Sequence, residues 1–319
     1  MDVDATFPVA QAANIEVTTD ARWLIESLWT HQAVGIIGGC PKCCKSWFGL
    51  DMAVSIASAT ACLGRYEVHT PGRVLVYLAE DALPQVRARI ASLCRSRAID
   101  IGTVDVHVIT APALRLDIEQ DQKRLMSTVA KHKPILLLLD PLVRLHRLDE
   151  NSSADIAALL GFLRQLQRTH ATSVAVVHHM SKKRKADLGQ ALRGSGDIHA
   201  WADSSAYLVG NRDGLVLSLE HRAAAAPQPI HLRLTEGLAP HLAVNPTADN
   251  TEQVPLTETL RRLIVSANAP FTRVALRAQL RVNNARLGDA LLRLQSDNHI
   301  ERVKDGWVAK TTAQKSLPQ

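Results

Sequence analysis

The stretch GIIGGCPKCCKSW, residues 35–47, limits the possible folds more than any other part of the sequence. An apolar run leads into a Gly-Gly turn, and Lys45 and Ser46 then open a helical pattern. A strand, a short loop and a helix N-terminus in this order place backbone N–H groups around a phosphate chain, with the lysine near the β- and γ-phosphates and the hydroxyl on Mg²⁺. The sequence therefore predicts a phosphate-binding loop in an α/β fold.

The loop departs from the common phosphate-loop pattern at one position. Against G-x-x-x-x-G-K-[ST], Gly39, Lys45 and Ser46 match, whereas Cys44 occupies the place of the second glycine. Glycine suits this place because the loop needs permissive dihedral angles, so we expect Cys44 to be tolerated if its φ is negative. A purely structural turn is the alternative, and the rate of hydrolysis stays open. The residues expected to bind ATP are Gly39, Cys40, Pro41, Lys42, Cys43, Cys44, Lys45, Ser46 and Trp47.

Three of the five cysteines lie within this loop. An odd number of cysteines, so closely spaced, argues against a disulfide scaffold. The C-x-x-C spacing also suits a zinc ligand pair or a redox dithiol, but no second ligand pair follows at a usable distance. We therefore favour small thiols that fill the loop. A thiol beside a helix N-terminus and Lys45 is expected to have a lowered pKa.

Residues 33–210 alternate short apolar runs with longer amphipathic segments, as parallel strands and crossover helices do. Two later runs, Leu215–His221 and Ile230–Thr235, alternate like antiparallel strands and are expected to extend one edge of the sheet. The expected parallel strands are Val34–Ile37, Val74–Leu78, Val106–Ile109, Ile135–Leu139 and Ser173–Val177, and the expected helices are Lys45–Ala57, Gln85–Arg97, Asp121–Lys131 and Ala154–Thr169.

Acidic residues follow two of these strands. Asp140 ends one apolar run, the form of a Walker B element that holds Mg²⁺ through a water at the carboxyl edge of the sheet. Glu80 follows the run that ends at Leu78 and should reach the same edge, where a carboxylate can deprotonate the water that attacks a γ-phosphate. The alternative for Asp140 is a capping role, and the alternative for Glu80 is an N-cap or a solvated loop position. We predict a Mg²⁺ site at Ser46 and Asp140 and a catalytic base at Glu80.

The last parallel strand delivers His178 and His179 to this edge. There an imidazole can sense the γ-phosphate, and we expect His179 to do so, although either histidine could instead be a buried core residue. Further on, Arg193 is a candidate arginine finger for the γ-phosphate of a neighbouring subunit, with an ordinary structural arginine as the equal alternative. The intervening segment is polar and basic, and either forms a surface loop or binds nucleic-acid phosphates through Lys182, Lys183, Arg184 and Lys185.

A polar segment at residues 245–255 is expected to link two domains. Three helical patterns follow, at Leu256–Ser266, Arg273–Leu280 and Asn284–Asn298, and an Asp-Gly turn then joins two short strands. This order suggests a winged helix. The predicted organisation is an ATPase domain at residues 1–244 with an N-terminal extension over about 1–30, the linker, a winged-helix domain at 256–310 and a flexible tail at 311–319.

The C-terminal domain is the expected duplex-binding part. The net charge of the whole chain is +6, and residues 251–310 hold ten Arg or Lys against six Asp or Glu. Leu287, Leu291, Leu292 and Leu294 are expected to form the buried face of the last helix. Winged helices also dock proteins, which is the alternative. The candidate DNA contacts are Asn283, Asn284 and Arg286 at the start of that helix, and Arg302 and Lys304 on the wing.

Hydrophobic residues make up 46% of the chain and charged residues 21%, which excludes collagen, coiled coil and general disorder. No apolar run approaches the roughly 20 residues that a membrane-spanning helix needs, and the N-terminus lacks a basic start with an apolar stretch after it. We expect a cytoplasmic protein.

Five ordered elements, GGCPKCCKS, YLAED, LLLLDPLVRLH, VVHHMSK and LRGSGDIHAWADS, together resemble the RecA-like ATPases of the RepA type, the hexameric helicases of broad-host-range plasmids. The resemblance covers about residues 20–240. It implies a RecA-like P-loop NTPase core with a mainly parallel sheet, and ATP sites between the subunits of a ring. Matched to the motifs, it implies Lys45 and Ser46 on the phosphates and Mg²⁺, Glu80 as base, Asp140 at Mg²⁺, His179 as sensor and Arg193 as finger.

The leading hypothesis is thus an ATP-dependent DNA-binding motor, a helicase or loader of mobile-element replication, that forms a homo-oligomer and uses ATP and Mg²⁺. The main alternative is a DNA-binding regulator whose nucleotide site acts as a switch with slow or absent turnover. Cys44 favours the switch, and Glu80 favours the motor. A recombination or signalling ATPase of the wider RecA and KaiC group is a third possibility.

Overall fold

The computed structural model describes residues 9–14, 22–180, 189–192, 194, 196–211, 214–245, 256–267, 269–280 and 284–310. The chain divides into two units, Met1–Pro246 and Thr247–Gln319. The division falls inside the linker expected at 245–255, of which residues 246–255 lie outside the described residues. Each unit is considered by itself below.

Within the described residues, nine strands of the first unit form one sheet. They are β3 Val34–Gly39, β4 Val74–Leu78, β5 Val106–Val108, β6 Leu136–Asp140, β7 Ser173–His179, β8 Ser204–Asn211, β9 Gly214–His221, β10 Ile230–Leu234 and β11 Leu242–Val244. Their order is β11-β10-β9-β8-β3-β7-β6-β4-β5. From β8 to β5 all neighbours are parallel, and β9 to β11 add an antiparallel edge. The predicted α/β class and the antiparallel extension are confirmed, whereas β8 was not identified in the sequence.

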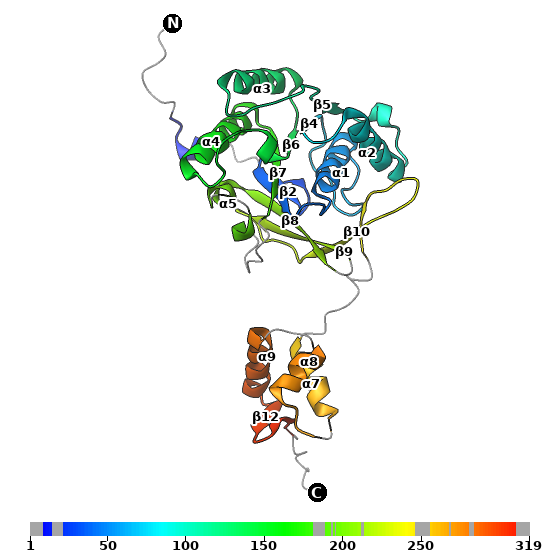
Figure 1. The fold of residues 1–319 in the computed structure, drawn as a ribbon, viewed down its shortest axis with the longest axis vertical. Coiled ribbons are helices and arrows are strands. Elements are labelled where there is room, and N and C mark those ends of the chain that lie inside the picture. The colour runs from blue at the N-terminus through cyan, green and yellow to red at the C-terminus, as the bar shows by residue number, and fades with distance from the viewer. Residues whose placement is uncertain are drawn as a thin grey trace. The chain divides into compact units, whose positions relative to one another are not determined.

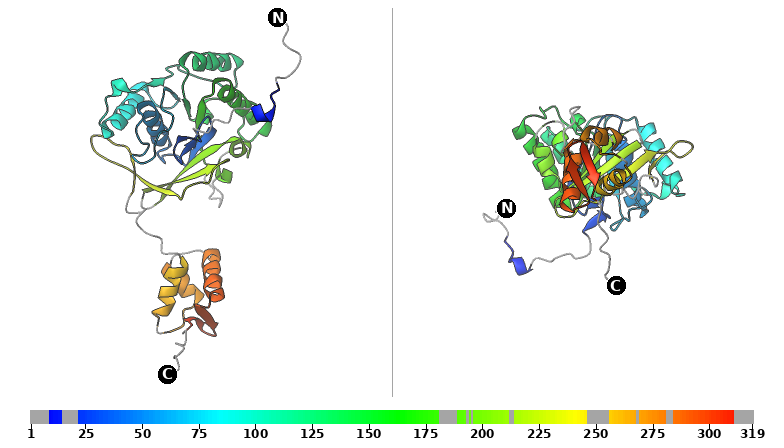
Figure 2. Two further views of the ribbon diagram at one scale, coloured as in Figure 1. Left: turned by 180° about the vertical axis from the view of Figure 1, so that it is seen from behind. Right: turned by 90° about the horizontal axis from the view of Figure 1, so that it is seen from below.

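Helices cover both faces of the parallel part (Figure 1). The inner strands are buried on both faces, because alternate residues join different cores. In β4, Val74 and Val76 share a core with α1 Lys45–Ser58 and α2 Leu83–Ser96, while Leu75 and Tyr77 share a second core with α3 Glu119–His132 and α4 Ser153–His170. The view from behind shows the same division of the helices (Figure 2). The four expected helices are therefore present, and their ends lie close to the predicted ones.

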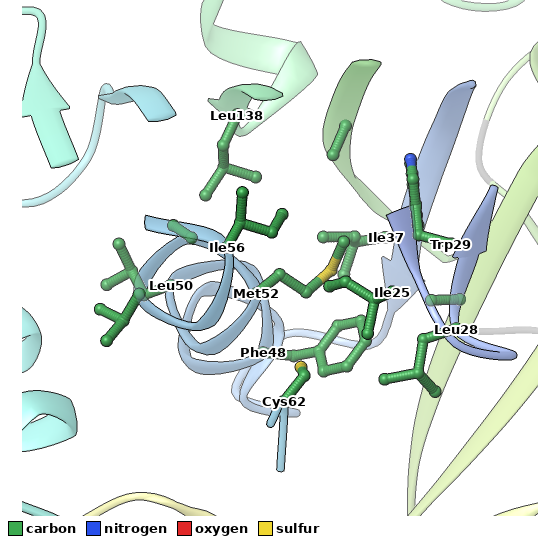
Figure 3. Packing of buried hydrophobic residues seen from close by; sticks show 14 of the residues in the cluster. Ile25, Leu28, Trp29, Ile37, Phe48, Leu50, Met52, Ile56, Cys62 and Leu138 are labelled. Atoms are coloured by element: carbon green, nitrogen blue, oxygen red, sulfur yellow. The ribbon is translucent and has the colours of Figure 1, made fainter. Parts of the chain in front are cut away.

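A short hairpin, β1 Trp23–Ile25 and β2 Trp29–Thr30, lies within the expected N-terminal extension. Trp29 is fully buried and belongs to the same core cluster as Phe48 and Met52 of α1 (Figure 3). Gly35 makes this packing possible, since a Cβ there would lie 1.8 Å from the Ser204 carbonyl oxygen and 2.8 Å from the Trp29 ring. Leu24, Ile25, Leu28 and Trp29 are thus part of the first core.

Short helical segments connect the larger elements. The one that matters for the site is η3 Leu142–Arg144, which follows β6 directly. The others are η1 Ala12–Asn14, η2 Ile101–Thr103, η4 Gly189–Ala191 and α5 Asp197–Trp201.

The second unit has three helices and a hairpin in its described part. These are α7 Leu256–Val265, α8 Arg273–Leu280, α9 Asn284–Ser296, β12 Ile300–Val303 and β13 Gly306–Ala309. They follow the predicted pattern closely. Leu287, Leu291 and Leu294 of α9 are buried, with Leu260 and Ile264 of α7, in a core separate from that of the first unit.

The prediction for Leu292 is wrong, because this side chain is 65% exposed. Residues 287, 291 and 294 are three or four positions apart and share one helix face, whereas residue 292 is rotated by about 100° from its neighbour.

Among the described residues, no helix is long and apolar enough to cross a membrane.

Candidate nucleotide-binding site

The carboxyl ends of four adjacent strands bring the predicted residues together. Gly39 on β3 is paired with His179 on β7, and Leu78 on β4 is paired with Asp140 on β6. The phosphate loop and Glu80, which follow β3 and β4, therefore leave the sheet at the same edge. A pocket of about 290 Å³ opens there, lined by Lys42, Cys43, Cys44, Lys45, Ser46, Trp47, Glu80, Arg89, Asp140 and His179.

Lys45 is buried at the start of α1, and its Nζ donates a hydrogen bond to the Cys40 carbonyl oxygen at 2.7 Å. Burial lowers the pKa of Lys45, although the negative charges of Asp140 and Glu80 act in the opposite direction. Gly39 allows the loop to begin so close to the sheet, since a Cβ there would lie 2.6 Å from the Leu208 carbonyl oxygen. A buried ammonium group held by a backbone oxygen at a helix N-terminus is poised to exchange that oxygen for a phosphate.

The structure corrects two expectations about Cys44. Its φ is +58°, in the left-handed region, so the residue is not accommodated through a negative φ. This backbone costs a residue with a Cβ about 1–2 kcal/mol. The pKa of the Cys44 thiol is also raised and not lowered, because burial and the neighbouring Cys43 outweigh the cations Arg89 and Lys45. The thiol is therefore not activated by its place at the helix N-terminus.

Asp140 and Ser46 meet the requirements of a magnesium site. Burial raises the pKa of Asp140 to about 6, and a hydrogen bond from the Ser46 hydroxyl opposes that rise. The Asp140 Oδ2 atom is buried and has no hydrogen-bond partner in the described part of the chain. A buried carboxylate oxygen without a partner, next to a hydroxyl, is the donor set expected for a hydrated Mg²⁺. The residues present fit the ion.

Glu80 is half-exposed at the mouth of the pocket, and its Oε1 accepts a hydrogen bond from Arg144 Nε at 2.7 Å. Arg144 belongs to η3, directly after the strand that carries Asp140. Glu80 was predicted from the sequence, whereas its partner, 64 residues away in the chain, was not.

The two histidines differ in environment. His178 is fully buried, while His179 is half-buried and lines the pocket. Burial lowers the pKa of His179, with the cation Lys45 acting in the same direction, so its ring is neutral at neutral pH. Its Nδ1 atom is buried and has no hydrogen-bond partner among the described residues.

Arg89 of α2 lines the pocket and was not predicted from the sequence. Its guanidinium forms an ion pair with Asp81 and lies over the Trp47 ring, with Cζ 5.8 Å from the ring centroid. Arg89 lies well after Glu80 in the chain, so the amphipathic pattern of α2 was the only available signal. The pocket thus has an aromatic wall and a cation in addition to the phosphate loop.

Several predicted residues cannot be placed. Lys182, Lys183, Arg184, Lys185, Arg193 and Asn283 lie outside the described residues, and the side chains of Asn284 and Arg286 are not described. All five cysteines are free thiols. In the part of the chain that the structure describes, no group of three or more His, Cys, Asp or Glu is placed to hold a metal ion by itself.

Arg302 and Lys304 of the second unit line a pocket of about 240 Å³ between the β12–β13 turn and the start of α8. Two hydrogen bonds between Phe271 and Trp307, at 3.0 and 2.9 Å, fasten the segment before α8 to the hairpin. Gly306, with φ +147°, permits this contact, since a Cβ there would lie 2.4 Å from the Phe271 carbonyl oxygen. The other lining residues are Thr272, Arg273, Val303, Asp305, Gly306 and Trp307.

Comparison with known proteins supports this description of the first unit. A model of the AAA domain family matches residues 6–185, more than half of the chain. One solved structure, described as an ATPase domain, is 13% identical, with a TM-score of 0.51 over 68% of this chain and 90% of that chain. The RadB recombinase is 16% identical, with a TM-score of 0.47 over 64% of this chain and 88% of that chain. No curated protein matches the sequence. The likeness to the solved ATPase domain confirms the predicted RecA-like P-loop fold.

Proposed function

The chain belongs to the AAA domain family, and we propose that it is a DNA-stimulated ATPase. In this proposal it is a ring-forming motor or helicase loader of the RepA type that serves the replication of mobile elements. The observation that carries this proposal is the common edge at which Lys45, Ser46, Glu80 and Asp140 line one pocket. Those residue types at one edge of a parallel sheet supply each role that phosphoryl transfer to water needs.

In this reaction Lys45 leaves the Cys40 carbonyl oxygen and binds the β- and γ-phosphates. Ser46 and Asp140 would hold Mg²⁺, and the ion would supply positive charge beside the phosphates. Glu80 orients the attacking water and takes its proton through a carboxylate oxygen. His179, neutral at the pocket edge, offers a ring nitrogen to the γ-phosphate and relays its presence to the segment after β7.

Trp47 and Arg89 extend the pocket beyond the phosphates. An indole ring beneath a guanidinium is a flat surface on which a nucleobase can stack. We assign these two residues to the base end of ATP.

The second unit contacts duplex DNA in this proposal, as a winged helix. Its support is the pocket between the hairpin turn and α8, whose lining includes Arg273, Arg302 and Lys304 against a single acid, Asp305. Three cations beside a helix N-terminus suit a backbone phosphate. A protein partner for this unit is the alternative. Duplex affinity of a chain ending at Pro246 separates the two, because unchanged affinity removes the second unit from DNA binding.

A subunit ring, with six subunits favoured, completes the proposal. Arg193 would then reach the ATP of the neighbouring subunit. Mixing Arg193→Ala subunits with Glu80→Gln subunits tests this, since activity in the mixture arises only if the arginine acts in trans.

One specific observation favours the second candidate, a nucleotide-switched DNA-binding regulator. Cys44 holds a strained backbone in the phosphate loop, where the usual glycine has none. A loop of this kind suits tight binding with slow turnover.

Steady-state ATP hydrolysis, with and without single-stranded or duplex DNA, decides between the two candidates. Glu80→Gln is the blank, because it removes the carboxylate and keeps the shape of the side chain. Turnover that rises with DNA and disappears in Glu80→Gln supports the motor. Tight ATP binding without turnover supports the regulator.

A further inference from the structure

We propose that Cys40 and Cys43 form an oxidation site in the phosphate loop: hydrogen peroxide converts the two thiols to a disulfide, and the disulfide closes the loop to ATP. This inference rests on the proposed function, and in particular on the binding of ATP phosphates by the loop. Neither thiol takes part in ATP hydrolysis in that proposal, so the two side chains are available for a separate role.

A tight turn brings the two cysteines together. The backbone N–H of Cys43 donates a hydrogen bond to the Cys40 carbonyl oxygen at 3.3 Å. The residues between them are Pro41 and Lys42, and Lys42 has φ +65°. Proline in the second place and a left-handed residue in the third are typical of a type II β-turn, whose first and last Cα atoms lie less than about 7 Å apart. A disulfide spans Cα atoms about 4.4–6.8 Å apart, so the bond can form while the turn stays folded.

Exposure decides which thiol reacts first. Cys40 is half-buried, whereas Cys43 is buried. The Cys40 thiol loses its proton and its sulfur attacks one oxygen of the peroxide; the O–O bond breaks, and a sulfenic acid and one water result. The Cys43 sulfur then attacks the Cys40 sulfur, an S–S bond replaces the S–O bond, and the second water leaves with the Cys43 proton. The two sulfur atoms lose two electrons in total, and the peroxide gains them.

The carbonyl oxygen of Cys40 connects this site to ATP binding. It accepts hydrogen bonds from two groups, Lys45 Nζ at 2.7 Å and the Cys43 N–H at 3.3 Å. A phosphate chain in such a loop binds the same kinds of donor, the lysine ammonium and backbone N–H groups. ATP binding therefore draws both donors away from the Cys40 oxygen. A disulfide between residues 40 and 43 keeps the turn closed and opposes that exchange.

Oxidation and ATP binding are therefore linked, and each opposes the other. A disulfide that weakens ATP binding by some factor is itself disfavoured by bound ATP to the same extent, and such couplings typically amount to about 5- to 150-fold. We expect oxidation to lower the affinity for ATP at least about five-fold. Saturating ATP should correspondingly protect the two thiols from peroxide.

The test uses the full chain, reduced or treated with hydrogen peroxide, and a fluorescent ATP analogue as the probe. Oxidation should lower the affinity for the analogue, a thiol reductant should restore it, and peptide mass mapping should show a bond between Cys40 and Cys43. Cys40→Ser and Cys43→Ser should each lose the response to peroxide. Each variant is compared with its own reduced form, so that any effect of the serine itself on binding cancels. Cys44→Ser is the matched control, since it removes a thiol of the same loop and should keep the response.

Three outcomes overturn the inference and leave the proposed function standing. They are equal affinities of the reduced and oxidised chains, a response to peroxide that persists in Cys43→Ser, and a disulfide that joins a different pair of cysteines. Because Cys40 packs against both cores of the first unit, Cys40→Ala replaces the serine variant if the latter unfolds. A reduced chain that binds no ATP analogue instead overturns the proposed function, and this inference with it, so the two failures are distinguishable.

Discussion

Cys44→Gly should stabilise the protein, although it removes a side chain. Cys44 has φ +58°, where a residue with a Cβ is strained by about 1–2 kcal/mol and glycine is not. Glycine offsets part of this gain, because it loses about 0.5–1 kcal/mol more conformational entropy on folding. The thiol is only partly buried against the first core, so its loss offsets a further small part of the gain. The expected net change is a stabilisation of roughly 0.5–1 kcal/mol in the free energy of unfolding.

The matched control is Cys43→Gly. Cys43 is the adjacent residue of the same type, it is buried, and its φ is not positive. Glycine at position 43 relieves no backbone strain. The substitution removes a buried side chain and raises the conformational entropy of the unfolded chain. We expect a destabilisation of roughly 1–2 kcal/mol.

Urea unfolding of the ligand-free chain at constant pH measures both variants against the unmodified protein. The two substitutions should move the midpoint in opposite directions. If Cys44→Gly lowers the urea midpoint as far as Cys43→Gly does, the positive φ of Cys44 does not destabilise the folded protein, and the prediction is wrong. A parallel ATPase assay shows whether the strain also slows turnover, since Cys44→Gly restores the common loop pattern.

Three further predictions concern the pocket and the second core. Lys45→Ala should abolish binding of a labelled ATP analogue, and undiminished binding would disprove the phosphate-loop assignment. Asp140→Asn should stabilise the metal-free protein in EDTA at pH 7.5 by up to about 3 kcal/mol. The reason is that the pKa of Asp140 is about 6 in the folded protein and 3.8 in the unfolded chain, so ionisation of this carboxyl opposes folding as the pH rises above 3.8. The stabilisation should therefore vanish near pH 4, and a stabilisation that does not depend on pH would contradict this prediction. Leu291→Ala should destabilise the second unit by about 2–5 kcal/mol while ATP binding persists, because the Leu291 side chain is buried. Leu292→Ala should change the stability by less than about 0.5 kcal/mol, because that side chain is exposed. Equal effects of the two substitutions in a thermal melt would show that the helix is packed differently.

The inner strands of the parallel sheet were predictable because they are buried on both faces. Such strands are continuous apolar runs, and Val74–Leu78 was predicted with the bounds that the structure shows. The polar residues after these runs, Glu80 and Asp140, could be placed at one edge because parallel strands all end on the same side. The hairpin β1–β2 was not predictable, since its two strands have three and two residues. Periodicity needs longer runs than that.

The class of fold, the phosphate loop and most of the residues that meet at the carboxyl edge could be read from the chain alone, because all three follow from local patterns and strand direction. The left-handed backbone of Cys44, the exposure of Leu292 and the ion pair between Glu80 and Arg144 depend on how the chain packs and could not be predicted in this way. A dihedral angle depends on how the loop closes onto the helix. A contact across 64 residues depends on which strands become neighbours, and that is settled by the packing of the whole sheet.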